Sequence, residues 1–315
     1  MSACAICGHE TTPWLRQPLD PKKNEPSPYA EFVRCGSCGH GAMFPLPSPD
    51  EIPGFYQLPQ YYTQGDSHIA PHPATLADKV LTKLAYLADK RGNFDPAELK
   101  SRLPGNAAAL DIGCGGGALL EQYHALGWKA VGIEPDPATI SRKSDAIDVH
   151  AGTGEDIPDA VRARQYQLIS MTHVLEHCID PLLALKNVHA LLADEGVFWC
   201  EVPNAACVHF ETMNICSENF DAPRHLHFFT EESLRVACDA AGLEITETYF
   251  WGLTRHHNRD WREWEKTIHD RTLALDPTAA PPRHSFGASV AMLAQEAFAA
   301  PAQKYDCFGV LAKKR

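Results

Sequence analysis

The segment Leu110–Gly117 constrains the fold more than any other part of the chain. It reads Leu-Asp-Ile-Gly-Cys-Gly-Gly-Gly, an apolar run that ends in an acid and then turns on glycines. Glycines at a strand-to-helix turn let the backbone approach a ligand closely, and the helix N-terminus supplies unpaired N–H groups. A second acid, Glu134, follows the next apolar run, where a carboxylate can accept hydrogen bonds from a ribose. The pattern predicts a nucleoside-cofactor site.

The position of Asp111 bears on which cofactor binds. With Ala118 as the last small residue, the glycine pattern also satisfies the loose dinucleotide form, so an NAD-dependent oxidoreductase is one alternative. A carboxylate two residues before the first glycine, however, would repel a pyrophosphate and attract an ammonium group. The segment 152–158 adds acids after a third strand-like run, and these suit the amino group of an adenine. The residues favour a cofactor with a charged amino acid tail.

Strand-like and helix-like segments alternate through residues 104–315, which predicts an α/β fold with a doubly wound, mostly parallel, seven-stranded sheet. The predicted helices are 117–127, Ala138–Ser144, Pro181–Leu192 and Glu231–Ala241, with Gly127 and Gly196 closing the first and third. The predicted strands are Ala107–Leu110, Lys129–Ile133, Asp148–Ala151, Leu168–Thr172 and Val197–Val202, with a closing antiparallel hairpin of Glu244–Trp251 and Tyr305–Lys313.

Ligands of such sheets bind at the carboxyl ends of the strands. Four features of the chain follow strands directly and are expected to meet there. They are Asp111, Glu134, Asp156 and the segment 171–173.

Two Cys-x-x-Cys pairs form the second strong signal. Cys4 and Cys7 lie in Cys-Ala-Ile-Cys-Gly-His, and Cys35 and Cys38 lie in Cys-Gly-Ser-Cys-Gly-His. Two such turns complete a tetrahedral zinc site, and Gly8 and Gly39 fit a position that often takes positive φ. Four unrelated thiols, or a ligand role for His9 or His40, are the alternatives. We expect a closed, structural Zn²⁺ site within a ribbon at 1–45.

Charge and hydropathy exclude several classes of function. The formal net charge of −12 argues against binding to nucleic-acid phosphate, and no apolar run is long enough to span a membrane. The N-terminus lacks the pattern of a secretory signal, so we expect a cytoplasmic protein whose eleven cysteines are thiols or metal ligands. Residues 46–103 are predicted to form a connector, rich in proline and tyrosine at its start, and a covering helix at 74–90. Its apolar stripe at Leu76, Val80, Leu84 and Leu87 is expected to cover the sheet.

Several motifs resemble those of class I S-adenosylmethionine (SAM) methyltransferases. They are Asp111–Gly117, Met171-Thr172-His173-Val174-Leu175-Glu176-His177 with Asp180-Pro181, and Arg224-His225-Leu226-His227-Phe228-Phe229-Thr230. The cysteine pairs, the proline stretch at 45–49 and the tyrosines at 55–62 resemble the zinc-ribbon methyltransferases of sugar, polysaccharide and natural-product pathways. The resemblance implies a small-molecule substrate.

The resemblance also implies roles for individual residues. Asp111 and Gly113 would meet the amino acid end of SAM, while Gly115 and Gly117 shape the loop. Glu134 would hold the ribose hydroxyls. The adenine would lie between Asp156 and Ile157. The sulfonium would be bordered by Met171 or Thr172, next to His173, and the cofactor would be capped by Tyr61 or Tyr62.

The methyl transfer itself needs alignment of donor and acceptor, and a base if the acceptor is a hydroxyl or a carbon acid. Histidine is suited to that role near neutral pH, and His177, His225 and His227 are the candidates alongside His173. His225 and His227 alternate in an extended run and therefore point to one side. The alternatives are structural: a hydrogen bond that fixes the loop at His177, and packing at the other two.

Residues 254–303 interrupt the closing hairpin of the domain at 104–315. The insertion is expected to be helical, with Trp261, Trp264 and Ile268 on one stripe, and to act as a lid or a homodimer interface. Its cluster of Arg255, Arg259 and Arg262 with His256 and His257 could bind an acceptor carboxylate or phosphate, or form a solvated face.

The sequence thus predicts a zinc-ribbon enzyme that methylates a small polar metabolite from SAM, with oxygen the favoured acceptor atom and nitrogen or carbon possible. A non-catalytic methyltransferase-like binding module and an NAD-dependent oxidoreductase remain the alternatives.

Overall fold

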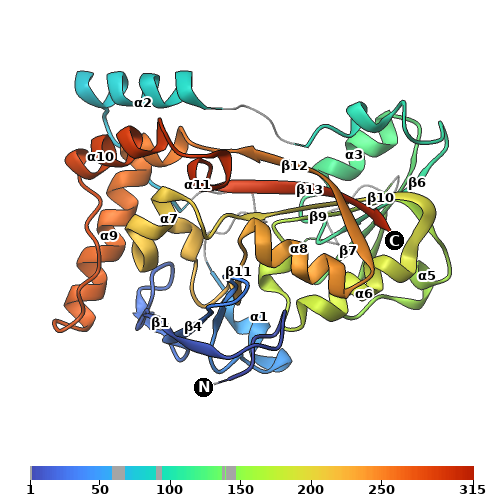
Figure 1. The fold of residues 1–315 in the computed structure, drawn as a ribbon, viewed down its shortest axis with the longest axis horizontal. Helices are drawn as coiled ribbons and strands as arrows, with labels where there is room; N and C mark the ends of the chain where they lie inside the picture. The colour runs from blue at the N-terminus through green and yellow to red at the C-terminus, as the bar shows by residue number, and fades with distance from the viewer. Residues whose placement is uncertain (1, 59–67, 90–93, 137–138, 140–146) are drawn as a thin grey trace.

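A seven-stranded sheet forms the centre of the molecule (Figure 1). The computed structural model describes residues 2–58, 68–89, 94–136, 139 and 147–315. In spatial order the strands are β12 (Leu243–Trp251), β13 (Cys307–Lys314), β10 (Leu192–Pro203), β9 (Tyr166–Thr172), β6 (Ala108–Ile112), β7 (Lys129–Glu134) and β8 (Asp148–Ala151). Strand β13 is antiparallel to both of its neighbours, and the other pairings are parallel. The predicted α/β class is confirmed.

Alternating side chains along each strand divide the core into two layers. Leu110 and Ile112 of β6 belong to the layer covered by α6 (Pro181–Leu191) and α8 (Glu231–Ala240). Ala109 belongs to the opposite layer, which contains Leu120 of α3 (Ala118–Ala125). Polar residues at the strand ends therefore project from one defined face of the sheet.

Most predicted helices and strands begin and end within five residues of their observed bounds. One residue, Gly196, lies in a different kind of element from the one predicted. Gly196 was expected to close a helix, but α6 ends at Leu191 and β10 begins at the next residue. Leu192 already has extended backbone angles, φ −69° and ψ 134°, so Gly196 lies inside the strand. The predicted helix at Ala138–Ser144 falls outside the described residues except for Thr139.

The N-terminal strands form a separate small sheet. Strands β1 (Thr11–Arg16), β4 (Glu31–Cys35) and β5 (Gly41–Met43) pair antiparallel, and β2 (Leu19–Asp20) pairs with β3 (Glu25–Pro26). The fourth strand of the small sheet, β11 (His227–Phe228), comes from the other half of the chain and pairs with β5. Figure 1 shows the N-terminal strands of this sheet, in blue, below the central sheet. Backbone hydrogen bonds therefore join the ribbon to the larger domain.

The expectation that the helix at 74–90 covers the sheet is wrong. Helix α2 (Leu76–Ala88) lies along the outer edge of the molecule in Figure 1 and contacts α10 (Phe286–Glu296) and η7 (Arg255–His257). Its apolar stripe faces outward, and the exposed fractions are 80% for Leu76 and 68% for Leu87. The buried face carries Asp78, whose carboxylate pairs with Arg262. Helical periodicity identified the helix, but this ion pair favours burial of a different face.

The insertion forms a helical layer at one end of the sheet (Figure 1). It comprises η7 (Arg255–His257), α9 (Arg259–Leu275), α10 (Phe286–Glu296) and α11 (Pro301–Lys304). Trp264 and Ile268 of α9 pack in a core with Phe210 of α7 (Val208–Met213). No helix in the described ranges is long and apolar enough to cross a membrane.

Short helical segments fill the connections. They are η1 (Pro49–Glu51), α1 (Ile52–Phe55), η3 (Pro96–Leu99), α5 (Asp159–Arg162), η4 (Leu175–His177), η5 (Asn214–Cys216) and η6 (Glu218–Phe220).

Candidate active site

The loop between β6 and α3 depends on glycine for its shape. Gly113, Gly115 and Gly117 have φ angles of +72°, +46° and +81°. A Cβ on Gly113 would lie 2.4 Å from Cγ2 of Val174, whereas a Cβ on Gly115 would meet nothing within 4 Å. The first glycine is therefore required by packing, and the second leaves open space beside the backbone.

The loop is fixed against the end of β7. The amides of Gly113 and Cys114 donate to the carbonyl of Ile133 over 2.8 and 3.0 Å. The amide of Gly115 donates to Oε2 of Glu134 over 2.7 Å. Glu134, which is 4% exposed, thus connects the two strand ends that a nucleoside cofactor would bridge.

Asp111 is held by a buried chain of hydroxyl groups. Ser170 Oγ donates to Asp111 Oδ1 over 2.6 Å, and the hydroxyl of Tyr123 donates to Ser170 Oγ over 2.8 Å. Burial and the negative charge of Asp111 raise the pKa of Tyr123 well above its usual range, so Tyr123 remains a donor. This arrangement presents a fixed carboxylate beside the glycine loop.

The other predicted cofactor residues are spread along the same edge of the sheet. Asp156 is exposed and Ile157 is buried, both in the segment that follows β8. The side chain of Met171 is fully buried on the α6 side of the sheet, while the neighbouring Thr172 faces the opposite layer. Tyr62 and its neighbour Tyr61 lie outside the described residues. The contacts of these residues with a cofactor remain predictions.

A cavity of about 790 Å³ opens at the carboxyl edge of the sheet, within the size range of small-molecule sites. One end is lined by the glycine loop and Asp111, and the other by the ends of β9, β10, β12 and β13. Phe94 and Trp251 supply aromatic surface, and Thr172, His173, Glu201 and Arg255 supply polar groups. The cavity therefore connects a cofactor loop to a second, mixed polar and aromatic chamber.

His173 is the most constrained polar group in this cavity. Its φ of +54° is uncommon for a residue other than glycine, and such strain often accompanies function. Nδ1 lies 3.2 Å from Oε1 of Glu176, and Nε2 lies 3.2 Å from Oε1 of Glu201. Burial alone would lower the pKa of His173, but hydrogen bonds to Cys307, Glu176 and Glu201 raise it well above the usual range. An imidazolium between two carboxylates therefore faces the cavity.

The arginine cluster predicted in the insertion is neither fully solvated nor free. Arg255 lines the cavity, and its Nε donates to Oδ2 of the buried Asp306 over 2.5 Å. Its Nη2 lies 3.0 Å from Sγ of Cys307, and its guanidinium packs over the ring of Trp261. Arg259 and Arg262 instead pair with Asp78 of α2.

The three histidines proposed as bases lie away from the lining of this cavity. His177 Nδ1 is 2.9 Å from both the hydroxyl of Tyr56 and the carbonyl of Arg224. His225 packs edge-on against His177, and its Nδ1 is 2.8 Å from the carbonyl of Asn219. Nδ1 of His227, in β11, lies 3.2 Å from Nε2 of His40 in the ribbon. These contacts favour the structural alternatives, and the catalytic roles stay predictions.

Sequence reasoning missed four residues of the site: Ser170, Glu201, Asp306 and Cys307. A polar residue inside the apolar strands at 168–172 and 197–202 was a usable signal for the first two. The other two come from the far side of the insertion, and nothing local connects them to the glycine loop.

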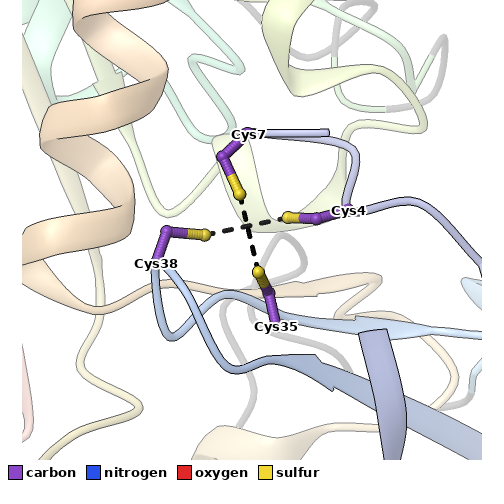
Figure 2. A group of neighbouring side chains, drawn as sticks. All are labelled: Cys4, Cys7, Cys35 and Cys38. Carbon is purple, nitrogen blue, oxygen red and sulfur yellow. Dashed lines mark hydrogen bonds between the residues drawn. The ribbon is translucent and has the colours of Figure 1, made fainter. Parts of the chain in front are cut away.

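The four paired cysteines converge on one point (Figure 2). Sγ of Cys4 lies 3.7 Å from Sγ of Cys38, and Sγ of Cys7 lies 3.5 Å from Sγ of Cys35. Four sulfurs bound to one zinc at about 2.3 Å would lie about 3.8 Å apart, so the arrangement fits such an ion.

The two cysteine turns have the same backbone. The amides of Gly8 and Gly39 donate to the carbonyls of Cys4 and Cys35, and both glycines have positive φ as predicted, +74° and +76°. His9 is exposed, and His40 lies with Nδ1 3.8 Å from Sγ of Cys4, outside the group of converging ligand atoms. The donor set is four thiols.

Comparison with known proteins supports the predicted assignment of the larger domain to the methyltransferases. A family model described as a methyltransferase domain matches residues 76–248, more than half of the chain. A ubiquinone biosynthesis O-methyltransferase from Azorhizobium caulinodans is 30% identical over 151 residues, 44% of this chain. The chain spans 59% of the length of that relative. A ubiquinone biosynthesis O-methyltransferase from Actinobacillus pleuropneumoniae serotype 7 is 29% identical over 201 residues, which cover 55% of this chain and 86% of the relative.

Solved structures give more distant matches. The 1,6-didemethyltoxoflavin-N1-methyltransferase of Burkholderia thailandensis, bound to 1,6-didemethyltoxoflavin and S-adenosylhomocysteine, has a TM-score of 0.47 at 15% identity and covers 89% of this chain and 98% of its own. An S-adenosylmethionine-dependent methyltransferase of Mesorhizobium loti has a TM-score of 0.44 at 16% identity and covers 70% and 96%.

The family match agrees with the preference for SAM over NAD that Asp111 indicated. The strand order, the glycine loop and the family match together place this chain among the class I SAM-dependent methyltransferases.

Proposed function

We propose that this protein transfers a methyl group from SAM to a hydroxyl oxygen of a small polar metabolite. The observation that carries the proposal is the single cavity that runs from the glycine loop and Asp111 to His173 and Glu201. Donor and acceptor bound at its two ends would meet beside Thr172, and holding them in line is the main source of acceleration for such a displacement.

The cofactor would occupy the end of the cavity formed by β6 and the glycine loop. Asp111 would bind the ammonium group of SAM, while Gly113, Gly115 and Gly117 allow its close approach. Glu134 would hold the ribose, with Asp156 and Ile157 beside the adenine and Met171 or Thr172 near the sulfonium. The two glutamates around His173 exceed its single positive charge, so this wall would favour the positively charged sulfonium.

The acceptor would occupy the end lined by Phe94, Trp251 and Glu201. Oxygen is favoured because the relatives above are named as O-methyltransferases, and the aromatic lining suits a ring that bears a hydroxyl group. As the oxygen attacks the methyl carbon, the O–H proton passes to the Glu201 carboxylate, the C–O bond forms and the S–CH3 bond breaks. Neutral S-adenosylhomocysteine leaves. His173 would orient Glu201 through their 3.2 Å contact.

The experiment compares Glu201→Gln with Glu195→Gln, the same change at an exposed position. S-adenosylhomocysteine release is measured with 3,4-dihydroxybenzoate and related hydroxylated aromatics, and deuterated methyl from labelled SAM is located by mass spectrometry. Glu201→Gln is expected to lower kcat by about 100-fold or more while the Kd for S-adenosylhomocysteine, which lacks the sulfonium charge, stays the same. Unchanged kcat, or label found on nitrogen or carbon, would contradict the proposal.

We also infer that Cys4, Cys7, Cys35 and Cys38 hold one structural zinc ion, supported by the sulfur distances and the matching turns. Four thiolates leave no open position, so the ion would stabilise the ribbon rather than take part in methyl transfer. X-ray absorption at the zinc edge should then include a shell of sulfur at about 2.3 Å. Absence of sulfur from that shell would refute the assignment.

A homodimer through residues 254–303 is a further part of the proposal. Phe286 and Val290 of α10 are 41% and 45% exposed, and Phe298 is 93% exposed, which supports an apolar contact surface. Sedimentation velocity at several concentrations tests it, and a monomer at all of them would exclude it. The eleven free cysteines support a reducing compartment such as the cytoplasm.

A further inference from the structure

Three fully buried polar side chains converge away from the cavity, between the insertion and the methyltransferase core. His209 comes from α7, Glu265 from α9, and His284 from the segment before α10. Each is at most 1% exposed, and their ligand atoms all lie within 4.8 Å of one another. The methyl transfer proposed above uses none of them.

The two oxygens of Glu265 have different surroundings. Oε1 accepts hydrogen bonds from the indole N–H of Trp261, over 2.8 Å, and from the amide of Glu218, over 3.1 Å. Oε2 lies 3.1 Å from Nε2 of His209 and 2.5 Å from Nδ1 of His284. Nε2 of His209 also lies 3.0 Å from Oε1, so His209 contacts both oxygens of the carboxylate, while His284 contacts Oε2.

Histidines are the ion-pair partners of Glu265. Its side chain is 0% exposed and pairs with His209 and His284, whereas no lysine or arginine among the described residues pairs with it. Buried carboxylates are commonly paired or bound to metals. Asp306, in the adjacent buried group, is instead paired with the guanidinium of Arg255. The group of His209, Glu265 and His284 thus combines two imidazoles and one carboxylate, a donor set that can also hold a metal ion.

The surroundings of the two histidines also resemble those of metal ligands. Nε2 of His284 lies 2.7 Å from the hydroxyl of Ser289, the kind of outer contact that fixes the tautomer and orientation of a ligating imidazole. The ring of His209 stacks on that of His256 with centroids 4.1 Å apart, which fixes its plane. Both rings are thus held with one nitrogen directed toward Oε2 of Glu265.

We propose that His209, Glu265 and His284 bind a divalent transition metal ion, with Zn²⁺ the leading candidate. Two imidazoles and one carboxylate suit such ions, and the ion would place a permanent positive charge beside the buried carboxylate. The three ligands come from segments separated by 56 and 19 residues, so the ion would fasten the insertion to the core. This site is distinct from the four-cysteine site, and it does not depend on the proposed methyl transfer.

The test measures metal in the purified full-length protein after incubation with Zn²⁺ and removal of unbound ions. Elemental analysis is expected to find two metal ions per chain, falling to one in His284→Gln. The matched control is His257→Gln, a change at another fully buried histidine, which should retain both ions. X-ray absorption of the unaltered protein should show a mixed first shell, with nitrogen and oxygen at about 2.0–2.2 Å beside sulfur at about 2.3 Å.

The absorption spectrum keeps the test decisive if a variant fails to fold. A single ion with only sulfur in its first shell overturns this proposal and leaves the ribbon site intact. A single ion with only nitrogen and oxygen supports the proposal and contradicts the ribbon. Two ions retained in folded His284→Gln would also overturn it.

Discussion

Replacing Asp111 with asparagine tests the electrostatic basis of cofactor selection. The substitution keeps the size of the side chain and its ability to accept the hydroxyl of Ser170, but removes the negative charge beside the glycine loop. A hydrogen bond to a charged group contributes about 1.5–3 kcal/mol. At about 1.4 kcal/mol for each factor of ten in Kd, SAM should bind the variant roughly 10- to 100-fold more weakly.

Isothermal titration with three ligands separates this charge effect from damage to the fold. S-adenosylhomocysteine has the same amino acid tail as SAM and should lose affinity equally. 5′-Methylthioadenosine lacks the tail, so its Kd should not change. Equal losses for all three ligands would indicate a damaged site, and no loss for SAM would refute the role assigned to Asp111.

Ser170→Ala is the matched control for the position of the carboxylate. The variant removes the hydroxyl that joins Tyr123 to Asp111 but keeps the charge. We expect a smaller loss of SAM affinity, below about tenfold, because the carboxylate charge that would bind the ammonium group remains and only a hydrogen bond that orients it is lost. A loss larger than that of Asp111→Asn would mean that geometry, rather than charge, determines binding.

Three further predictions concern the loop and the buried charges. Gly113→Ala should lower the free energy of unfolding by at least about 2 kcal/mol, because its positive φ and the contact with Val174 both oppose a Cβ. Gly115→Ala should lower it by only about 1–2 kcal/mol, because no atom lies near its Cβ, but should weaken SAM binding. Urea unfolding measures the loss of stability, and titration with SAM measures the loss of affinity. Arg224→Met should destabilise by about 3–5 kcal/mol because it leaves two buried aspartates without their guanidinium, and a loss below 1 kcal/mol in urea would contradict this. Burial raises the pKa of Glu176, but nearby histidines lower it to about 2. Its stabilising contribution is therefore present above pH 4.5 and is lost as the pH falls toward 2. In Glu176→Gln the free energy of unfolding should depend less on pH between 4.5 and 2, and an unchanged pH dependence would exclude the effect.

Local patterns predicted the sheet well because each strand is an apolar run with its own boundaries. The strand at Asp148–Ala151 begins and ends as predicted, and the other strands differ by a few residues. The orientation of α2 could not be obtained in this way. Periodicity defines a helix and its faces, but the buried face was decided by Asp78 and its partner Arg262, 184 residues away.

The same distinction between local patterns and distant contacts applies to the residues of the candidate active site. The acids and glycines that follow strands could be located, since all parallel strands end at one edge of the sheet. Glu201 approaches His173 because β10 pairs with β9, and Cys307 approaches it because β13, from a distant segment, pairs with β10. Of the two histidines predicted in an extended run, only His227 lies in β11, because the amide of His225 closes a turn onto the carbonyl of Asp221. Alternation also does not show which neighbour a strand will contact.

The pairing of β11 with β5 has a consequence for any attempt to divide this protein. A chain shortened to begin after residue 45 would lack the partner of β11 and would expose apolar side chains such as Phe228 that now pack against Phe32. An unprotected strand of this kind promotes self-association. Losing the first 45 residues should therefore yield a protein that aggregates. The proposed zinc ion, by stabilising those residues, would then indirectly protect the solubility of the methyltransferase domain.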